Sequence, residues 1–310
     1  MRLLVTGAAG FIGQNLLHRL AGHPDYTVWA LDRNAMYAAP PSVTLAGNVT
    51  LCTSDAGSTD AIAEHRIDTV VHLAGSTGVR ESDANPLDFI DNNVRATAHI
   101  FEQARQHGVR RVVYASSSSV YGSGGSGSGG SSSVYGLTKA MCDDLAAYYG
   151  RRHGLSCIGL RFFTVYGRYG RPDMAVARFT TELLAGRPVT VFGSGEQTRD
   201  FTHVDDAVDA IMAALEAPVM SGVYDVGPRT PIAVNRLIDI IAEELGVLTV
   251  DRVHTAGHAA DALATLADPA PLYRDLHVRP AVGAEDGVRS YVRWRKTTAC
   301  CENSCQFPTN

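Results

Sequence analysis

The sequence predicts an α/β fold in which helices cover a doubly wound parallel sheet, with a smaller C-terminal lobe beside it. Short apolar segments of strand length alternate with longer segments whose apolar residues recur at helical spacing, which is the pattern of parallel sheets. A glycine-rich turn separates the first of these strands from the first helix. The alternation weakens after residue 165, and a second, smaller unit is therefore expected there.

The expected elements follow in chain order. Apolar runs predict strands at residues 2–6, 26–31, 69–74, 111–116 and 155–163. Helical spacing predicts helices at 11–20, 87–107, 138–153 and 174–185, the last before a strand at 189–192. Because ligands of doubly wound sheets bind beyond the carboxyl ends of the strands, the residues that follow each strand are the first candidates for a site.

Composition restricts the kind of protein. A chain of 310 residues, 45% hydrophobic and 19% charged, is typical of a soluble globular protein. The net charge is −5 and the sequence has no basic stripe, which argues against nucleic acid and anionic membrane as partners. No apolar run approaches the roughly 20 residues of a membrane span, and Met1 leads directly into the first strand. A cytoplasmic location is therefore expected.

The six cysteines fall into two groups. Three stand among apolar residues and are expected to be buried free thiols, namely Cys52, Cys142 and Cys157. The others are Cys300, Cys301 and Cys305, in a segment (297–310) without hydrophobic period or histidine. A metal cluster there would need a fourth ligand at suitable spacing, so we expect no metal site and a disordered tail.

The glycine-rich turn carries the first chemical signal. Gly7, Gly10 and Gly13 repeat at Gly-x-x-Gly-x-x-Gly spacing between strand and helix, where a backbone can cradle the pyrophosphate of a dinucleotide. Asp32 ends the next strand, about 20 residues on, where a carboxylate binds the ribose hydroxyls. It favours NAD over NADP, although Arg33 offers a guanidinium to a 2′-phosphate. Asp32 would also fit an exposed loop or a helix cap.

These signals define a Rossmann-type NAD-binding domain at residues 1–165, to which residues 200–226 are expected to return. Residues 166–199 and 227–296 are expected to form a substrate-binding lobe. Asp55 follows a short apolar stretch of the first domain. It is a candidate adenine contact and is equally suited to an ordinary turn.

Tyr135 and Lys139 form the second signal. Four residues apart on a helix, a phenol and an ammonium share one face. A free tyrosine has a pKa of about 10, and a nearby ammonium lowers such a pKa toward the range in which a phenol exchanges protons at neutral pH. Tyr-x-x-x-Lys also arises by chance on exposed helices, so the pair gains its meaning from the other motifs.

Four consecutive hydroxyls, Ser116–Ser119, end the strand before this pair. They suit hydrogen bonding to a sugar hydroxyl and to the tyrosine oxygen, or else form a polar turn. The following segment, Ser123–Ser133, contains only Gly and Ser, a composition that behaves as a flexible linker. It is either a natural low-complexity loop or an artificial replacement of a mobile active-site loop.

Together these motifs resemble the extended short-chain dehydrogenase/reductase family, and within it the UDP-sugar 4-epimerases, above all the UDP-glucuronate 4-epimerases. The resemblance covers residues 1–294. Its most specific stretches are Val-Val-Tyr-Ala-Ser-Ser-Ser-Ser-Val-Tyr-Gly (112–122), Gly-Leu-Arg-Phe-Phe-Thr-Val-Tyr-Gly (159–167), Gly-Arg-Pro-Asp-Met (170–174) and Gln-Thr-Arg-Asp-Phe-Thr-His-Val-Asp-Asp (197–206). It implies NAD-dependent inversion at C4 of UDP-glucuronate, which gives UDP-galacturonate through a 4-keto intermediate.

The resemblance also assigns site residues. Ser117 is the catalytic hydroxyl, Tyr135 the base that takes the sugar O4 proton, and Lys139 the residue that holds the nicotinamide ribose and tunes that tyrosine. The residues expected to contact NAD are Gly7, Gly10, Phe11, Ile12, Gly13, Asp32, Arg33, Asp55, Leu73, Ala74, Gly75, Asn93, Tyr135, Lys139 and Phe162. The residues expected to contact the UDP-sugar are Arg80, Ser117, Ser118, Thr164, Arg171 and Arg199.

The substrate contacts have ordinary alternatives. Arg199 matches the arginine that pairs with the nucleotide diphosphate, or it forms a salt bridge with Asp200 or Asp205. The positions that match contacts to the uronate carboxylate are Arg80, Thr164 and Arg171. Each of these three would equally serve as an exposed or loop-pinning residue.

Acidic residues that this sequence lacks reduce the number of reactions that the resemblance allows. Related 4,6-dehydratases place an Asp-Glu pair, and uronate decarboxylases a Glu, where this chain has Ser118 and Ser119. This favours epimerisation, with a UDP-glucose or promiscuous UDP-hexose 4-epimerase as the alternative. Outside the enzymes, the alternative is a catalytically idle dinucleotide-binding scaffold or sensor.

Helices 87–107 and 138–153 resemble the pair that forms a dimer interface in this family, so a homodimer is expected, although their apolar stripes would also serve as monomer core.

Overall fold

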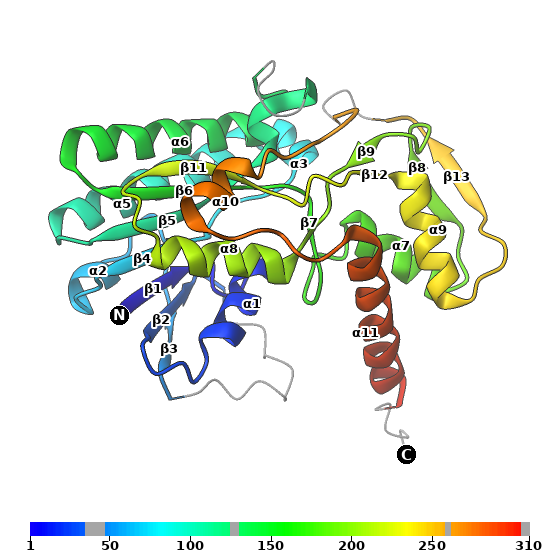
Figure 1. Cartoon of the computed structure of the whole chain (residues 1–310), viewed down its shortest axis with the longest axis horizontal. Coiled ribbons are helices and arrows are strands. Elements are labelled where there is room, and N and C mark those ends of the chain that lie inside the picture. The colour runs from blue at the N-terminus through cyan, green and yellow to red at the C-terminus, as the bar shows by residue number, and fades with distance from the viewer. Residues whose placement is uncertain (35–46, 125–129, 258–261, 305–310) are drawn as a thin grey trace.

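The molecule is built on one large sheet, with helices on both faces and a smaller lobe beside it (Figure 1). The computed structural model describes residues 1–34, 47–124, 130–257 and 262–304. The strands of the large sheet are β1 (Arg2–Thr6), β2 (Thr27–Asp32), β3 (Val49–Thr53), β4 (Thr69–His72), β5 (Arg111–Ser117), β6 (Ser156–Phe162) and β11 (Gly222–Val226). All seven are parallel, in the order β11-β6-β5-β4-β1-β2-β3. The predicted α/β class with a doubly wound, Rossmann-type sheet is confirmed.

The strand order locates the expected ligand crevice. The chain builds β1 to β3 outward in one direction and β4, β5, β6 and β11 in the other, so the order reverses between β1 and β4. Ligands of doubly wound sheets bind at such a switch point, outside the carboxyl ends of the strands. Thr6 and His72 end these two strands and are paired in register. The loops that follow them should therefore form the site.

Four long helices cover the sheet. On one face lie α1 (Phe11–Leu20) and α8 (Val204–Glu216), and on the other α5 (Ala96–Gln106) and α6 (Val134–His153) (Figure 1). Leu17 and Ile211 join one core cluster, whereas Phe101 and Ala146 join a second. The sheet is thus buried on both faces, as parallel sheets require. Shorter helices are α2 (Ala61–Glu64), α3 (Val79–Ala84) and α10 (Ala270–Leu276).

The single helix predicted at residues 87–107 is wrong in its centre. The segment consists of α4 (Pro86–Phe89), a π-helical stretch η1 (Ile90–Arg95) and then α5. Asn93 lies inside η1 with its side chain fully buried and hydrogen-bonded to Thr138 on α6. Because a π-helical turn accommodates an extra residue, it lets the helix turn this amide inward without losing its apolar stripe.

The smaller lobe has a core of its own. Its main elements are α7 (Ala175–Leu184), β8 (Val189–Phe192), α9 (Val234–Leu245), β13 (Arg252–Thr255) and α11 (Ala284–Ser304). Phe179, Leu237, Ile241 and Val288 meet in its centre. Two short strand pairs lie between the lobe and the sheet, namely β7 (Val165–Tyr166) with β10 (Thr202–His203) and β9 (Thr198–Arg199) with β12 (Ile232–Ala233).

Two expectations about the cysteines and the tail need correction. The predicted disordered tail at 297–310 is wrong for its first part, since α11 continues to Ser304; Cys305 and the residues after it lie outside the described residues. Cys142 and Cys157 are buried free thiols as predicted, but Cys52 on the edge strand β3 is only half-buried. Burial raises the pKa of Cys157 to about 12, which keeps that thiol protonated and unreactive.

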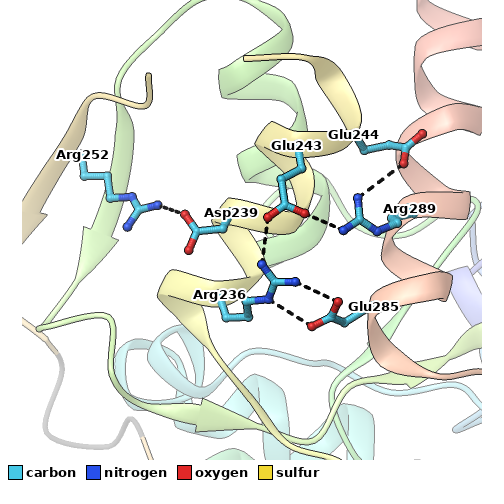
Figure 2. Close-up of polar contacts among 7 residues, drawn as sticks. All are labelled: Arg236, Asp239, Glu243, Glu244, Arg252, Glu285 and Arg289. Atoms are coloured by element: carbon cyan, nitrogen blue, oxygen red, sulfur yellow. Dashed lines mark hydrogen bonds and ion pairs between the residues drawn. The ribbon is translucent and has the colours of Figure 1, made fainter. Parts of the chain in front are cut away.

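Ion pairs join the two outer helices of the lobe (Figure 2). Arg236 on α9 binds Glu285 on α11 through two hydrogen bonds of 2.9 and 3.0 Å, and it also binds Glu243 on its own helix at 2.9 Å. Arg289 on α11 binds Glu243 in return, and these arginines hold the pKa of Glu243 below its usual range. Exposed pairs of this kind add little stability singly, but a shared network fixes the register of α9 against α11. Among the helices described, none is both long and apolar enough to cross a membrane.

Candidate active site

The glycine turn packs tightly against the sheet. Gly7 follows β1 with φ of +69°, and a Cβ there would lie 2.6 Å from the backbone nitrogen of Ala74 after β4. A Cβ on Gly13, in the first turns of α1, would lie 2.3 Å from the carbonyl oxygen of Gly7. Only glycine fits at these approaches, so the helix N-terminus at Gly10 is brought directly to the carboxyl end of β1.

A cavity of about 250 Å³ opens beside this turn, at the switch point of the sheet. Eight residues predicted to contact NAD line it, namely Gly7, Gly10, Asp32, Arg33, Asp55, Leu73, Ala74 and Gly75. Sequence reasoning did not identify the other lining residues, which are Ala9, Leu31, Asn34, Ser54, Ala56, Asn92 and Ala96. Phe11, Ile12 and Gly13 form the first turn of α1 and are not part of this lining.

Asp32 and Asp55 both accept hydrogen bonds from nearby backbone groups, and both also line the cavity. Asp32 accepts hydrogen bonds of 3.0 Å from the backbone N–H groups of Ala9 and Asn34, one on each carboxylate oxygen. Each oxygen keeps a further lone pair, so the carboxylate can also accept from two ribose hydroxyls. Asp55 accepts from the N–H of Gly57 at 2.7 Å, the turn role that the sequence left open, and it lines the cavity as well.

Arg33 is tied back within the cavity wall. Its guanidinium donates to the side-chain oxygen of Asn92 at 2.9 Å, and Asn92 in turn donates to the hydroxyl of Ser76 at 3.0 Å. The adjacent Asn93, predicted as a cofactor contact, is fully buried behind the wall. Asn92 has no distinguishing signal in the sequence beyond its place next to Asn93.

Lys139 lies at the edge of this cavity. Its ammonium is almost fully buried and donates to the carbonyl oxygen of Ala115 on β5 at 3.0 Å. A Cβ on Gly75 would come within 3.4 Å of that ammonium and 2.8 Å of the Asn93 side-chain oxygen. Gly75, Asn93 and Lys139 therefore converge, which joins the loop after β4 to helix α6.

The buried cation also acts on His72 at the end of β4. Burial, and then the charge of Lys139, lower the pKa of His72 to about 3. The ring stays neutral between the hydroxyls of Thr6, at 2.7 Å, and Thr97, at 3.1 Å. A neutral imidazole here leaves Lys139 as the local positive charge.

Tyr135 and Ser117 come from segments that touch. Tyr135 lies in the first turn of α6, with its ring edge-to-face against Phe89 at 6.2 Å. Ser117 ends β5, and its hydroxyl accepts from the N–H of Ser119 at 3.1 Å. A Cβ on Gly136 would lie 2.3 Å from the carbonyl oxygen of Ser119. The first turn of α6 thus packs directly on the 3₁₀ segment η2 (Ser118–Gly124), which begins with Ser118.

Arg171 is a candidate substrate residue that is tied to the loop after β4. Its guanidinium makes a bidentate ion pair with Asp173, at 3.0 and 2.5 Å, and it donates to the hydroxyl of Thr77 in the loop after β4. The bond to Asp173 raises the pKa of Arg171, and nearby Glu81 and Tyr135 act in the same direction. Arg171 therefore lies within electrostatic reach of the Tyr135 phenol.

The remaining candidates lie on the lobe side or in the sheet. The Arg80 guanidinium stands 4.1 Å from the ring centre of Phe192, which Arg178 also covers at 4.9 Å. Arg199 donates to the carbonyl oxygen of Thr198 at 2.8 Å. The carbonyl of Thr164 accepts from the N–H of Thr202 at 3.0 Å, and Phe162 is buried at the end of β6. These residues and the catalytic candidates Ser117, Tyr135 and Lys139 are outside the lining of the 250 Å³ cavity.

No group of three or more His, Cys, Asp or Glu side chains gathers at metal-binding distance in the part of the chain that the structure describes. The site contains instead a glycine turn, a carboxylate at the end of β2 and a Tyr/Lys pair at one edge of a parallel sheet. These features define a dinucleotide-dependent α/β enzyme. The chain belongs to the NAD dependent epimerase/dehydratase family, whose sequence pattern matches residues 3–227. NAD is accordingly the cofactor, and the cavity residues fit it.

Known proteins of this family resemble the chain over most of its length. A UDP-glucuronate 4-epimerase of Thermodesulfobacterium geofontis is 33% identical over 245 residues, which are 75% of this chain and 73% of that protein. MoeE5, solved with UDP-glucuronic acid and NAD and also with UDP-glucose and NAD, is 34% identical with a TM-score of 0.88, covering 96% of this chain and all of that one (100%). The UDP-glucuronic acid 4-epimerase from Bacillus cereus, solved with UDP-glucuronic acid and NAD, is 29% identical with a TM-score of 0.89, with coverage of 96% and 100%.

Proposed function

We propose that this protein inverts C4 of UDP-glucuronate to give UDP-galacturonate. The observation that carries the proposal is the place of Arg171, a guanidinium within electrostatic reach of Tyr135 and tied to the loop after β4. A planar guanidinium suits bidentate binding of a carboxylate. Proteins named for UDP-glucuronate among its relatives support the same substrate.

The chain's own residues supply the proton chemistry. NAD, held by the glycine turn and the cavity residues, would supply an acceptor and later a donor for the hydride of C4. Tyr135 removes the proton from the sugar O4 as the hydride leaves, and Ser117 holds that oxygen. Lys139 holds the nicotinamide ribose and supplies positive charge beside the phenol. After the 4-keto sugar has presented its other face, Tyr135 gives the proton back, so the reaction has no net redox change.

A uronate adds one demand at the 4-keto stage. The intermediate is a β-keto acid, which loses CO₂ when the bond to the carboxylate aligns with the carbonyl. Arg171 and Thr164 are proposed to hold the carboxylate out of that alignment, while Arg199 pairs with the diphosphate and Arg80 and Ser118 complete the sugar site. In this state the carboxylate of Asp173 and that of the substrate share one guanidinium.

The second candidate is a promiscuous UDP-hexose 4-epimerase. MoeE5 has been solved both with UDP-glucuronic acid and with UDP-glucose, so its site admits both sugars. A scaffold without activity is disfavoured, because Lys139 and Asn93 converge at the cavity edge while η2 and the first turn of α6 pack against each other.

Product analysis tests the proposal. Incubation with UDP-glucuronate is expected to give UDP-galacturonate without CO₂, as followed by chromatography and NMR. Arg171→Ala should lower kcat/KM for the uronate by about 100-fold, because an ion pair lost in a partly buried site costs about 2–3 kcal/mol, and should change turnover of UDP-glucose far less. Arg187→Ala, at an exposed arginine after α7, is the control. UDP-pentose as the main product, or equal losses on both sugars, contradicts the uronate assignment.

A homodimer is proposed from the outer face of α4, η1 and α6. Large apolar side chains there are exposed, among them Leu87 (74%), Met141 (40%) and Tyr148 (50%). Val94, Met141, Asp144, Leu145 and Tyr148 line a shallow groove on this face. A second copy of the chain would cover it and form an isologous four-helix contact.

The proposed dimer has a simple test. Met141→Glu should convert a dimer to a monomer in sedimentation analysis, because it places a charge in the centre of the apolar contact. Leu248→Glu, at a fully exposed residue (100%) between α9 and β13, should leave the mass unchanged. A wild-type protein that sediments as a monomer refutes the dimer.

A further inference from the structure

The two segments that carry Ser117 and Tyr135 are joined by an unusual stretch of sequence. Residues 123–133 contain only Gly and Ser, so they offer no apolar side chain with which to pack. Ser131 of this stretch donates to the carbonyl oxygen of Val120 at 3.4 Å, and we expect contacts outside the stretch to set most of the relative position of Ser117 and Tyr135. A partly buried chain of hydrogen-bonded polar side chains on the α6 face of the sheet supplies such contacts.

Arg161 on β6 is the centre of this chain. Its Nε and Nη2 both lie 2.9 Å from one oxygen of Asp143 on α6, and its Nη1 donates to the phenol oxygen of Tyr121 in η2 at 2.6 Å. The same guanidinium stands 4.9 Å from the ring centre of Tyr121. One side chain thus links the helix of Tyr135 to the segment that follows Ser117.

Both ends of the chain are anchored on neighbouring strands. The second oxygen of Asp143 accepts from the phenol of Tyr114 on β5 at 3.1 Å. Tyr121 donates to Asp225 on β11 at 2.7 Å, and Asp225 accepts from the N–H of Asp268 at 3.0 Å. Arg161 and Asp225 are paired in register, one position before the pair that contains Phe162. The anchor therefore lies directly beneath the carboxyl ends of β5 and β6.

Asp143 is placed to control the orientation of α6. It follows Lys139 by four residues and Tyr135 by eight, so the three side chains share one helix face. Lys139 is fixed to β5 through the Ala115 carbonyl, and Asp143 fixes the next turn to β5 and β6. Burial raises the pKa of Asp143, and the charge of Arg161 opposes this effect. Removing either partner would leave a buried charge unpaired.

We propose that the Asp143–Arg161–Tyr121 chain is a positioning device that sets the distance and angle between Tyr135 and Ser117. The inference rests on the proposed function in one respect, namely that these two residues act on the sugar. Tyr121, Arg161 and Asp143 are positioning residues, because they act through α6 and η2. These hydrogen bonds and ion pairs hold the two segments at a fixed distance, a role that an apolar loop between them could otherwise have.

Tyr121→Phe is the sharpest test, since it removes both hydrogen bonds of the phenol and keeps the ring. We expect kcat per NAD-bound enzyme to fall by about 10-fold to 100-fold, the effect of displacing reacting groups by about 1 Å, with KM for the UDP-sugar and the NAD content changed less than about two-fold. Tyr149→Phe is the matched control, because it removes a phenol bonded to Glu102 at 3.1 Å near the other end of the same helix. A kcat within two-fold of the wild type overturns the proposal.

Hydrogen–deuterium exchange supplies a readout that needs no turnover. In the NAD-bound protein, Tyr121→Phe should speed exchange in peptides covering residues 118–122 and 134–139, while Tyr149→Phe should not. The milder Arg161→Lys, which keeps the charge and loses the fork, should give an intermediate effect on both kcat and exchange. Unchanged exchange in both variants overturns the inference. If the wild type turns over no UDP-sugar, the proposed function fails, while the exchange result still decides the positioning role.

Discussion

Tyr135→Phe is expected to lower kcat by about 1,000-fold, the largest loss of any single substitution in this chain. The phenol is proposed to carry the proton of the sugar O4 in both directions, and a positioned proton carrier is worth about 100-fold to 10,000-fold. The ring contributes its edge-to-face contact with Phe89 at 6.2 Å, which phenylalanine keeps. The loss should therefore appear in kcat, whereas KM and the amount of bound NAD should stay close to the wild-type values.

The measurement is a progress curve at saturating UDP-sugar, with NAD content determined on the same sample. Tyr148→Phe, on the outer face of the same helix and half exposed in the single chain, is the control; phenylalanine keeps the apolar ring of the proposed dimer contact, so this variant should turn over normally. A Tyr135→Phe enzyme that keeps more than a tenth of wild-type kcat would show that another group carries the proton. In that case the roles of Tyr135 and Lys139 would have to be reassigned.

Gly13→Ala is expected to weaken NAD binding strongly. A Cβ at this position would lie 2.3 Å from the Gly7 carbonyl oxygen and 2.9 Å from the Cα of Ala8. These neighbours are backbone atoms, so the steric clash of the added methyl group can be relieved only by moving the backbone of the glycine turn. Overpacking of this kind costs about 1–3 kcal/mol, and affinity for the pyrophosphate should fall by about 100-fold, because its hydrogen bonds depend on the same backbone groups.

Titration calorimetry with NAD measures this effect, and thermal unfolding of the protein without added NAD measures the stability loss. Gly150→Ala on α6 is a matched control, since the nearest neighbour of its Cβ would be the hydroxyl of Ser221 at 3.3 Å and the nearest backbone atom, the carbonyl oxygen of Leu155, would lie at 3.6 Å. Alanine has the higher helix propensity by about 1 kcal/mol, so this variant should be as stable as the wild type or more so. NAD affinity of Gly13→Ala within three-fold of the wild type would contradict the tight packing of the turn.

The nucleotide-binding half of the site could be predicted because its signals are local. Gly7, Gly10 and Gly13 lie between one strand and one helix, and Asp32 ends the next strand, so a short stretch of sequence contains the whole cradle. The structure brings Gly7, Gly10 and Asp32 to a single cavity, with Gly13 packed against the backbone of Gly7. Parallel sheets also leave a clear pattern, because each strand is an uninterrupted apolar run.

Other features depend on contacts between distant segments. The π-helical stretch η1 was missed because one extra residue shifts the helical period only locally, and the reason for it is the bond from Asn93 to Thr138. The link from Arg171 to Thr77 spans 94 residues of sequence. The sequence does contain a weak signal for the Asp143–Arg161–Tyr121 chain, because Arg161 and Asp225 are each the one charged residue of their strand. Such a residue needs a partner, but the sequence does not say which.

The route of the chain has a consequence for how the protein is made. The chain leaves the large sheet after β6, builds part of the lobe, and returns only with α8 and β11, so the edge strand and the helix that packs beside α1 are synthesised after part of the lobe. A nascent chain that ends near residue 165 would leave the α1 side of its sheet open to water. Cutting the protein at the apparent border between its two units should therefore yield no autonomous NAD-binding fragment. The ribosome must pass residue 276 before the first unit can close, because Leu272 and Leu276 of α10 belong to the same core cluster as residues of α1 and α8.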